Sequence, residues 1–502
     1  MKLLGILRFE LAYQMRRPWP WLCLLVLVVF AFVNTRVAVV PVTLPQDFIL
    51  NSPFIIAVVT MISCQIWLLM APAIAGEAAA RDVHTGMHSL IYATPISRTE
   101  YLGGRFLAAV VVNAVILFGV QVGSLLAAHA PGVNPDIIGP FRPAAYLAAF
   151  GLLALPNICI ATAMQFSAAL LSGRPMASYL GSLILFFLTY PVTFVLYLSG
   201  LGERALMADP IGIMAIMNQM MSKWTIIEKN VRMFTLQGPM LWNRLLWLAI
   251  ALVTLAFVYL RFRFAHRTAA DWWSWLARAL GRLKARRSSR TAARQESGTT
   301  VPFVGRVRQS FGFGMQVRQT LSIAWSSFRM IGRSPAGLFL LVAYPAFVVL
   351  VLLVETEHWG IPLLPRTGYM LAEHITAPLT HFADFRVMVP LLIIYFASEL
   401  VWRERDARLS DTIDAAPVAE WVLFLGKLLG LAIVLAALMA SLTAAAMLTQ
   451  TIRGYRAFEL NLYLRILLGL QLPQYLLFAV LALAVQSVVN RKYLALMAAL
   501  AV

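Results

Sequence analysis

Two stretches decide the fold of this chain: GEAAARDVHTGMHSLIYATPISRTEYLGGRFLA (76–108) and SELVWRERDARLSDTIDAAPVAEWVLFLGKLLG (398–430). They align with each other without a gap, and the alignment pairs Glu77 with Glu399, Arg81 with Arg403, Pro95 with Pro417, Gly104 with Gly426 and Arg105 with Lys427. After a register shift of five residues, the outer pairs are Pro18 with Pro335, Tyr146 with Tyr463 and Pro156 with Pro473. We therefore predict an internal repeat.

Composition excludes a soluble cytosolic enzyme. Of the 502 residues, 61% are hydrophobic and 13% are charged, whereas soluble domains have about 45–50% apolar and about 25% charged residues. The apolar residues occur in blocks, many of them close to the roughly 20 residues that a helix needs to cross a bilayer. The sequence therefore predicts an all-α integral membrane protein.

The apolar blocks predict spans at 19–40, 54–75, 106–128, 144–171, 177–199, 244–262, 336–354, 387–401, 421–448 and 462–489. Block 493–502 is too short to cross, so we expect a second repeat that is incomplete in its fifth span. Six spans separate the copies, which predicts parallel repeats about an axis along the membrane normal. The predicted domains are a first six-span repeat (1–265), a basic cytoplasmic linker (266–314) and a truncated second repeat (315–502).

Charge sets the predicted orientation. The net charge is +19, and residues 261–333 hold 15 Lys and Arg against Asp271 and Glu296. The positive-inside rule places this interval in the cytoplasm, and the N-terminus with it. We expect a solvated linker beside anionic lipids rather than nucleic-acid binding. The predicted location is the cell (inner) membrane, crossed several times.

No motif for chemistry is present in the chain. Gly426 and Lys427 are followed by leucine, so there is no P-loop, and there is no HExxH zinc motif. None of the 22 acids lies in the middle of an apolar block, which argues against an ion-coupled carrier. Neutral polar groups in the spans could line a pathway or bond between helices, and we favour helix contacts: Asn113, Gln121, Asn157 and Gln165.

The repeated segment resembles the type-2 ABC transporter permeases, the membrane subunits of ATP-driven exporters. Their signature between spans two and three reads approximately E-R-E-x-G-T-L-x-x-L-L-x-T-P, then S-R and L-G-K. The first copy keeps Asp82, Gly86, Leu90, Ile91, Thr94, Pro95, Ser97, Arg98, Gly104 and Arg105, with His84 in place of the second acid. The second copy keeps Glu404, Arg405, Asp406, Pro417, Gly426 and Lys427, with Arg408 in place of the glycine.

The resemblance implies that each copy docks a separate nucleotide-binding ATPase subunit, which hydrolyses ATP-Mg, and that the permease moves an unknown substrate outward. No cofactor, metal or catalytic residue is expected in this chain itself. The predicted coupling residues are Glu77, Arg81, Asp82, Gly86, Pro95, Arg98, Arg105, Glu399, Arg403, Glu404, Arg405, Asp406, Pro417 and Lys427. Residues 1–17 and 315–333 resemble the interfacial helices that precede the first span in such permeases.

A narrower resemblance concerns permeases fused to a zinc aminopeptidase. It rests on ADPIG (208–212), Trp224, EKN (228–230), NRLLWL (243–248) and SELVWRERD (398–406). A peptidase would then lie beyond Val502 or be absent. The alternatives left open are a membrane anchor for such a peptidase, an ion-coupled carrier and a structural scaffold.

Overall fold

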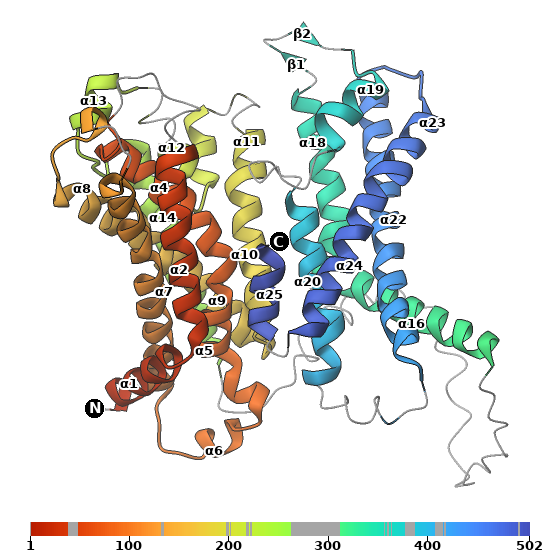
Figure 1. Cartoon of the computed structure of the whole chain (residues 1–502), viewed down its shortest axis with the longest axis horizontal. Coiled ribbons are helices and arrows are strands. Elements are labelled where there is room, and N and C mark those ends of the chain that lie inside the picture. Colours follow the sequence, from red (N-terminus) through yellow and green to blue (C-terminus); the bar gives the residue numbers. More distant parts are fainter. Residues whose placement is uncertain are drawn as a thin grey trace.

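The structure is a computed structural model of the whole chain, shown in Figure 1. It describes residues 2–38, 49–131, 135–196, 200, 202–216, 220, 223–262, 312–355, 357–358, 361–362, 364–376, 387–406, 415, 418–489 and 492–501. The predicted basic linker, 266–314, lies outside these residues except at its C-terminal end. We call 2–262 the first half and 312–501 the second half.

The first half is a helical bundle that begins with a short separate helix. Its elements are α1 (Lys2–Met15), α2 (Pro18–Val33), η1 (Asn34–Ala38), α4 (Pro53–Met70), α5 (Pro72–Thr85), α6 (His88–Tyr92), α7 (Arg98–His129), η2 (Pro135–Ile137), α8 (Pro143–Ala148), η3 (Ala149–Ala154), α9 (Leu155–Ser172), α10 (Ala177–Phe187), η4 (Leu188–Val192), α11 (Thr193–Leu196), η6 (Gly202–Ala208), α12 (Ile213–Ile216), α13 (Ile226–Val231) and α14 (Gly238–Arg261).

The second half also begins with a separate helix. Its elements are α16 (Phe313–Arg333), α17 (Pro335–Leu338), η9 (Phe339–Ala343), α18 (Tyr344–Glu355), β1 (Glu357–His358), β2 (Ile361–Pro362), α19 (Thr367–Tyr369), η10 (Met370–Ile375), α20 (Met388–Asp406), α22 (Glu420–Ile452), α23 (Leu460–Tyr463), η12 (Leu464–Gln471), α24 (Leu472–Val488) and α25 (Lys492–Ala501). Figure 1 shows α1, α6 and α16 at one end of the molecule, the α1 end, and α13 and the short β1–β2 hairpin at the other.

Eight helices among the described residues are long and apolar enough to cross a membrane. They coincide with eight of the ten predicted spans and confirm an all-α integral membrane protein. The predicted span 177–199 is not one continuous α-helix. The helix α10 has 11 residues, and the chain then continues as the π-helical η4, which contains Pro191. Proline has no N–H for the α-helical ladder, which explains the interruption. The predicted span 387–401 is α20, which runs on to Asp406 and carries charged residues in its last turns.

The two halves share local features at positions that the repeat aligns. Pro18 and Pro335 each occupy the first turn of the helix that follows α1 or α16. Farther along, η3 and η12 are both π-helical and both lead into a helix with proline in its first turn, Pro156 in α9 and Pro473 in α24. Each proline lacks the N–H for the α-helical bond and its ring crowds the preceding carbonyl, and a wider turn relieves both.

The contact of the separate helix with the third span also recurs. A side-chain carbon added at Gly104 of α7 would lie 2.9 Å from Ile6 Cγ2 of α1, and one added at Gly426 of α22 would lie 2.7 Å from Ile323 Cγ2 of α16. Only glycine admits so close an approach of two helices. Ile6 and Ile323 are related by the same register as Pro18 and Pro335.

The neutral polar residues predicted to bond between helices do so. Asn113 Nδ2 donates to Thr162 Oγ1 at 3.3 Å, and Asn113 Oδ1 accepts from Trp67 Nε1 at 3.2 Å. Gln121 of α7 donates to Thr60 of α4 at 2.9 Å. These bonds join α4, α7 and α9 inside the first half, so the helix-contact interpretation is confirmed.

The burial of an arginine at the end opposite the α1 end was not predicted. Arg244 of α14 is 1% exposed; its Nη1 donates to Asn157 Oδ1 of α9 at 2.5 Å, and its Nε donates to Asn243 Oδ1 at 3.0 Å. Asn243 Nδ2 in turn donates to the carbonyls of Leu206 and Asp209 at 2.7 and 2.8 Å. The cluster therefore fixes the segment between α11 and α12 against α9 and α14.

The two halves meet where α10 lies beside α20 and α25 (Figure 1). A small cavity of about 30 Å³ lies there, and Leu69 of α4 also lines it. Its apolar lining includes residues that the repeat registers pair with each other: Leu69 with Leu391, Tyr179 with Leu496 and Leu183 with Leu500. Nearby, the Phe187 ring packs edge-on against Phe339 at 4.9 Å and Phe347 at 4.8 Å.

Candidate functional site

The predicted coupling segment of the first half, 81–105, consists of the end of α5, the short α6 and the start of α7. α5 ends at Gly86, whose φ of 76° lies in the left-handed region that favours glycine. α7 starts at Ser97, whose hydroxyl accepts from the Glu100 N–H while the Glu100 carboxylate accepts from the Ser97 N–H. Pro95 lies in the turn between α6 and α7. Between α5 and α7 the segment forms only one further helix, the five residues of α6.

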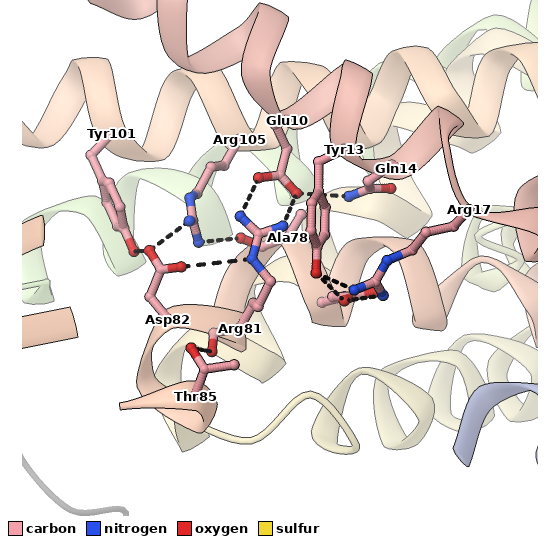
Figure 2. Close-up of polar contacts among 11 residues, drawn as sticks. Glu10, Tyr13, Gln14, Arg17, Ala78, Arg81, Asp82, Thr85, Tyr101 and Arg105 are labelled. Atoms are coloured by element: carbon pink, nitrogen blue, oxygen red, sulfur yellow. Dashed lines mark hydrogen bonds and ion pairs between the residues drawn. The ribbon is translucent and has the colours of Figure 1, made fainter. Parts of the chain in front are cut away.

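Arg81, one of the predicted coupling residues, is neutralised inside the protein. Its two terminal nitrogens donate to the two carboxylate oxygens of Glu10 on α1 at 2.9 and 2.7 Å. The side chains are only 10% and 1% exposed, and the Arg81 guanidinium lies 4.1 Å from the centre of the Tyr13 ring. Figure 2 shows that this pair ties α1 to α5.

A second ion pair joins α5 to α7. Arg105 Nη2 lies 2.5 Å from Asp82 Oδ2, and both side chains are 5% exposed. Tyr101 donates its hydroxyl to the same Asp82 oxygen at 2.9 Å, and Arg105 donates to the Ala78 carbonyl at 3.0 Å. Charge-assisted bonds of this kind, shielded from water, hold the two helices in a fixed relation.

Glu77, one turn before Arg81 on α5, completes the cluster in Figure 2. Its Oε1 accepts from Arg17 Nη1 at 2.5 Å and from the Tyr13 hydroxyl at 3.5 Å. Arg17 also donates to the Tyr13 hydroxyl. We call Glu10, Arg17, Glu77, Arg81, Asp82 and Arg105 the ion-pair cluster.

Sequence reasoning missed the partners Glu10, Tyr13, Arg17 and Tyr101. One signal could have found Glu10: it is the only acid in the first 17 residues, on a helix that otherwise carries cations. An acid buried in that position requires a cation from elsewhere in the chain.

The tip of the segment is exposed. Met87 is 48% and Leu90 64% exposed, and Gly86, Pro95 and Arg98 also reach the surface. The seven predicted residues of the first copy thus form two groups. One group is exposed at the tip: Gly86, Pro95 and Arg98. The other group lies inside the protein and connects the helices behind the tip: Glu77, Arg81, Asp82 and Arg105.

The second half repeats one of these ion pairs. Lys427 Nζ of α22 lies 2.6 Å from Glu404 Oε2 of α20. The repeat alignment pairs Lys427 with Arg105 and Glu404 with Asp82, so the same ion pair joins the same two spans in both halves.

The rest of the ion-pair cluster does not recur. Arg403, which aligns with Arg81, is exposed and contacts the Met330 sulfur of α16. α16 has Ser327 and Met330 at the positions where α1 has Glu10 and Tyr13. Arg405 is exposed and lies 4.9 Å from the centre of the Trp402 ring, and Glu399 is half-buried. Pro417 and the side chain of Asp406 lie outside the described residues.

No group of three or more His, Cys, Asp or Glu side chains within the described part of the chain could hold a metal ion. Of the histidines and acids between residues 355 and 384, His381 and Asp384 lie outside that part.

A comparison with family models matches residues 331–501 to the ABC-2 family transporter proteins. A comparison with curated proteins finds no match. The protein is an all-helical, multi-pass membrane protein, and the family match supports a permease component of an ABC transporter. The matched residues begin in the last turn of α16 and cover the second half.

Proposed function

We propose that this chain is the permease of an ATP-driven exporter. Separate ABC ATPase subunits would dock on the exposed tip of the first coupling segment, 81–105, and on the corresponding segment of the second half, 403–427. The observation that carries the proposal is the recurrent ion pair, Asp82–Arg105 and Glu404–Lys427. In both halves this ion pair joins the two helices that flank the predicted docking segment, at the α1 end of the molecule.

The cluster would transmit force from the tip to the spans. A push on α6 meets α5 and α7 joined by Asp82 and Arg105, and α1 joined to α5 by Glu10 and Arg81. Separating such a buried pair would leave an uncompensated charge, at a cost of about 3–5 kcal/mol. The three helices would therefore move as one body rather than let the tip bend alone.

The substrate path would open between the halves. The cavity there lies among α4, α10, α20 and α25, and paired positions of the repeat line it. At about 30 Å³ it has room for no more than a few water molecules. Passage of a larger substrate would require the halves to separate, which ATP-driven motion of the two tips would produce.

The proposal includes the two-repeat organisation and the topology predicted from the sequence. The shared proline, π-helix and glycine positions support two parallel repeats. The α1 end would face the cytoplasm, where ATP is available, and the membrane would be the cell (inner) membrane. A fused zinc aminopeptidase stays a prediction from the sequence, as does the chemical class of the substrate.

Site-specific photo-crosslinking in cells tests the docking. A photoreactive amino acid would replace Leu90 on the tip, and in a matched control it would replace Ile227, which is 77% exposed on α13 at the opposite end. We expect mass spectrometry to identify an ABC ATPase captured from position 90 and not from position 227. Capture of no ATPase from position 90 would contradict the proposal.

A further inference from the structure

The helix α16 has three distinct faces. Its inner face consists of Thr320, Ala324, Ser327 and Ile331, all buried. The spacing of four, three and four residues places these side chains on one side of the helix. They pack on α22, where Gly426 and Gly430 let the two helices approach closely. α16 is thus anchored in the protein along one face.

Beside the inner face runs an exposed apolar stripe. Val317, Leu321 and Trp325 follow one another at intervals of four residues and are 38%, 58% and 59% exposed. Figure 1 shows α16 lying across the α1 end of the bundle, at a steep angle to α22. A helix in this position presents such a stripe to the boundary of the bilayer, where tryptophan is favoured.

The next face is basic. Arg318, Arg329 and Arg333 are exposed, and intervals of 11 and four residues place them on one side of the helix, next to the apolar stripe. α16 contains no acid, and no ion pair found among the described residues involves these arginines. Their counter-charge therefore has to come from outside the helix.

The helix α1 is organised differently. At the position of Trp325 it has Arg8, so cations and apolar side chains share one exposed face. At the position of Ser327 it has Glu10, which neutralises Arg81 internally. Arg403, the counterpart of Arg81, is exposed instead. Among the described residues, Arg403 thus lacks the internal counter-charge that Glu10 gives Arg81 in the first half.

We propose that α16 is a binding site for anionic phospholipids. Leu321 and Trp325 lie among the acyl chains next to the headgroups, and Arg318, Arg329 and Arg333 bind the lipid phosphates. Surface arginines gain most from an anionic leaflet when an apolar stripe holds the helix at headgroup depth. By the same reasoning, α1 has the weaker preference for anionic lipid.

Fluorescence quenching in nanodiscs tests the site on the whole chain. Each disc contains ordinary phosphatidylcholine and one lipid with brominated acyl chains. The brominated lipid is phosphatidylglycerol in one set of discs and phosphatidylcholine in the other, at the same mole fraction. The difference between the wild-type protein and Trp325→Phe isolates the Trp325 signal. We expect brominated phosphatidylglycerol to quench Trp325 at least about twofold more than brominated phosphatidylcholine, and salt to reduce the difference.

A triple variant and a control tryptophan sharpen the test. In R318Q/R329Q/R333Q the headgroup preference at Trp325 should disappear while the spans still fold, which circular dichroism checks. Trp242, 64% exposed on α14, is the matched control and should be quenched equally by both lipids. Equal quenching of wild-type Trp325 by both lipids would overturn the proposal, and so would the absence of quenching by either.

Discussion

At the scale of single residues, the buried ion pair between the second and third spans is the feature that defines the coupling segment. Asp82 and Arg105 are almost inaccessible to water, as are Glu10 and Arg81 beside them. Charges in such surroundings are stable only while both partners are present. The position also accepts another acid and another base, because the second half has glutamate and lysine at the same two positions.

This yields a prediction for Arg105. Arg105→Leu leaves the Asp82 carboxylate buried without its cation, and we expect a loss of about 3–5 kcal/mol in the free energy of unfolding. Arg105→Lys should lose much less, because Lys427 makes the corresponding contact. Thermal unfolding of the detergent-purified proteins compares the two. Identical melting temperatures for Arg105→Leu and the wild-type protein would show that the pair braces nothing.

At the scale of helices, the crossing of the separate helix over the third span is set by a glycine in each half. Gly104 receives Ile6 of α1, and Gly426 receives Ile323 of α16. The contact involves the Cγ2 and Cβ atoms of each isoleucine and a backbone carbonyl oxygen rather than the ends of flexible side chains. Adding a methyl group must therefore shift the whole helix.

The adjacent glycines of α7 provide a matched test. A side-chain carbon at Gly104 would meet Ile6 Cβ at 3.0 Å, whereas one at Gly103 would meet only Leu3 Cδ1 at 3.5 Å. We expect Gly104→Ala to cost about 1–3 kcal/mol by overpacking and Gly103→Ala to be tolerated. Limited proteolysis of α1 provides the measurement. Faster cleavage of α1 in Gly104→Ala alone is the expected result, and equal cleavage in both variants would contradict it.

Much of the element order could be predicted from the sequence, because each span is an apolar block that hydropathy alone reveals. The interruption after α10 could not, since composition does not show that the helix widens around Pro191. The sequence indicated the segment in which the candidate site lies, but not which residues its charged side chains contact. Glu77, Arg81 and Asp82 are charged residues in a polar segment. Two of their partners, Glu10 on α1 and Arg17 just after it, come from the N-terminus, which no local pattern brings next to α5.

At the scale of the whole molecule, the two halves are alike in architecture and unlike in charge. Both have a separate helix, a proline-started span and a braced segment at the α1 end. In the first half the separate helix is tied to α5 by internal ion pairs. In the second half it exposes arginines to its surroundings. If ATPase subunits press on both tips, the first half would respond as a rigid body and the second would depend on the lipid around α16.

The most direct test of the central claim is the distance between the two coupling segments in the complex with an ABC ATPase from the same genome. Spin labels would replace Ala93 in the first half and the exposed Glu420 in the second, in a background with Cys23, Cys64 and Cys159 substituted. Pulsed electron paramagnetic resonance should show the distance shorten by several ångströms on addition of Mg-ATP, and Leu90→Asp on the tip should abolish the change. A distance that does not change on addition of Mg-ATP would contradict the proposal that ATPases act on this permease at its coupling segments. A distance that shortens equally in Leu90→Asp would contradict it as well.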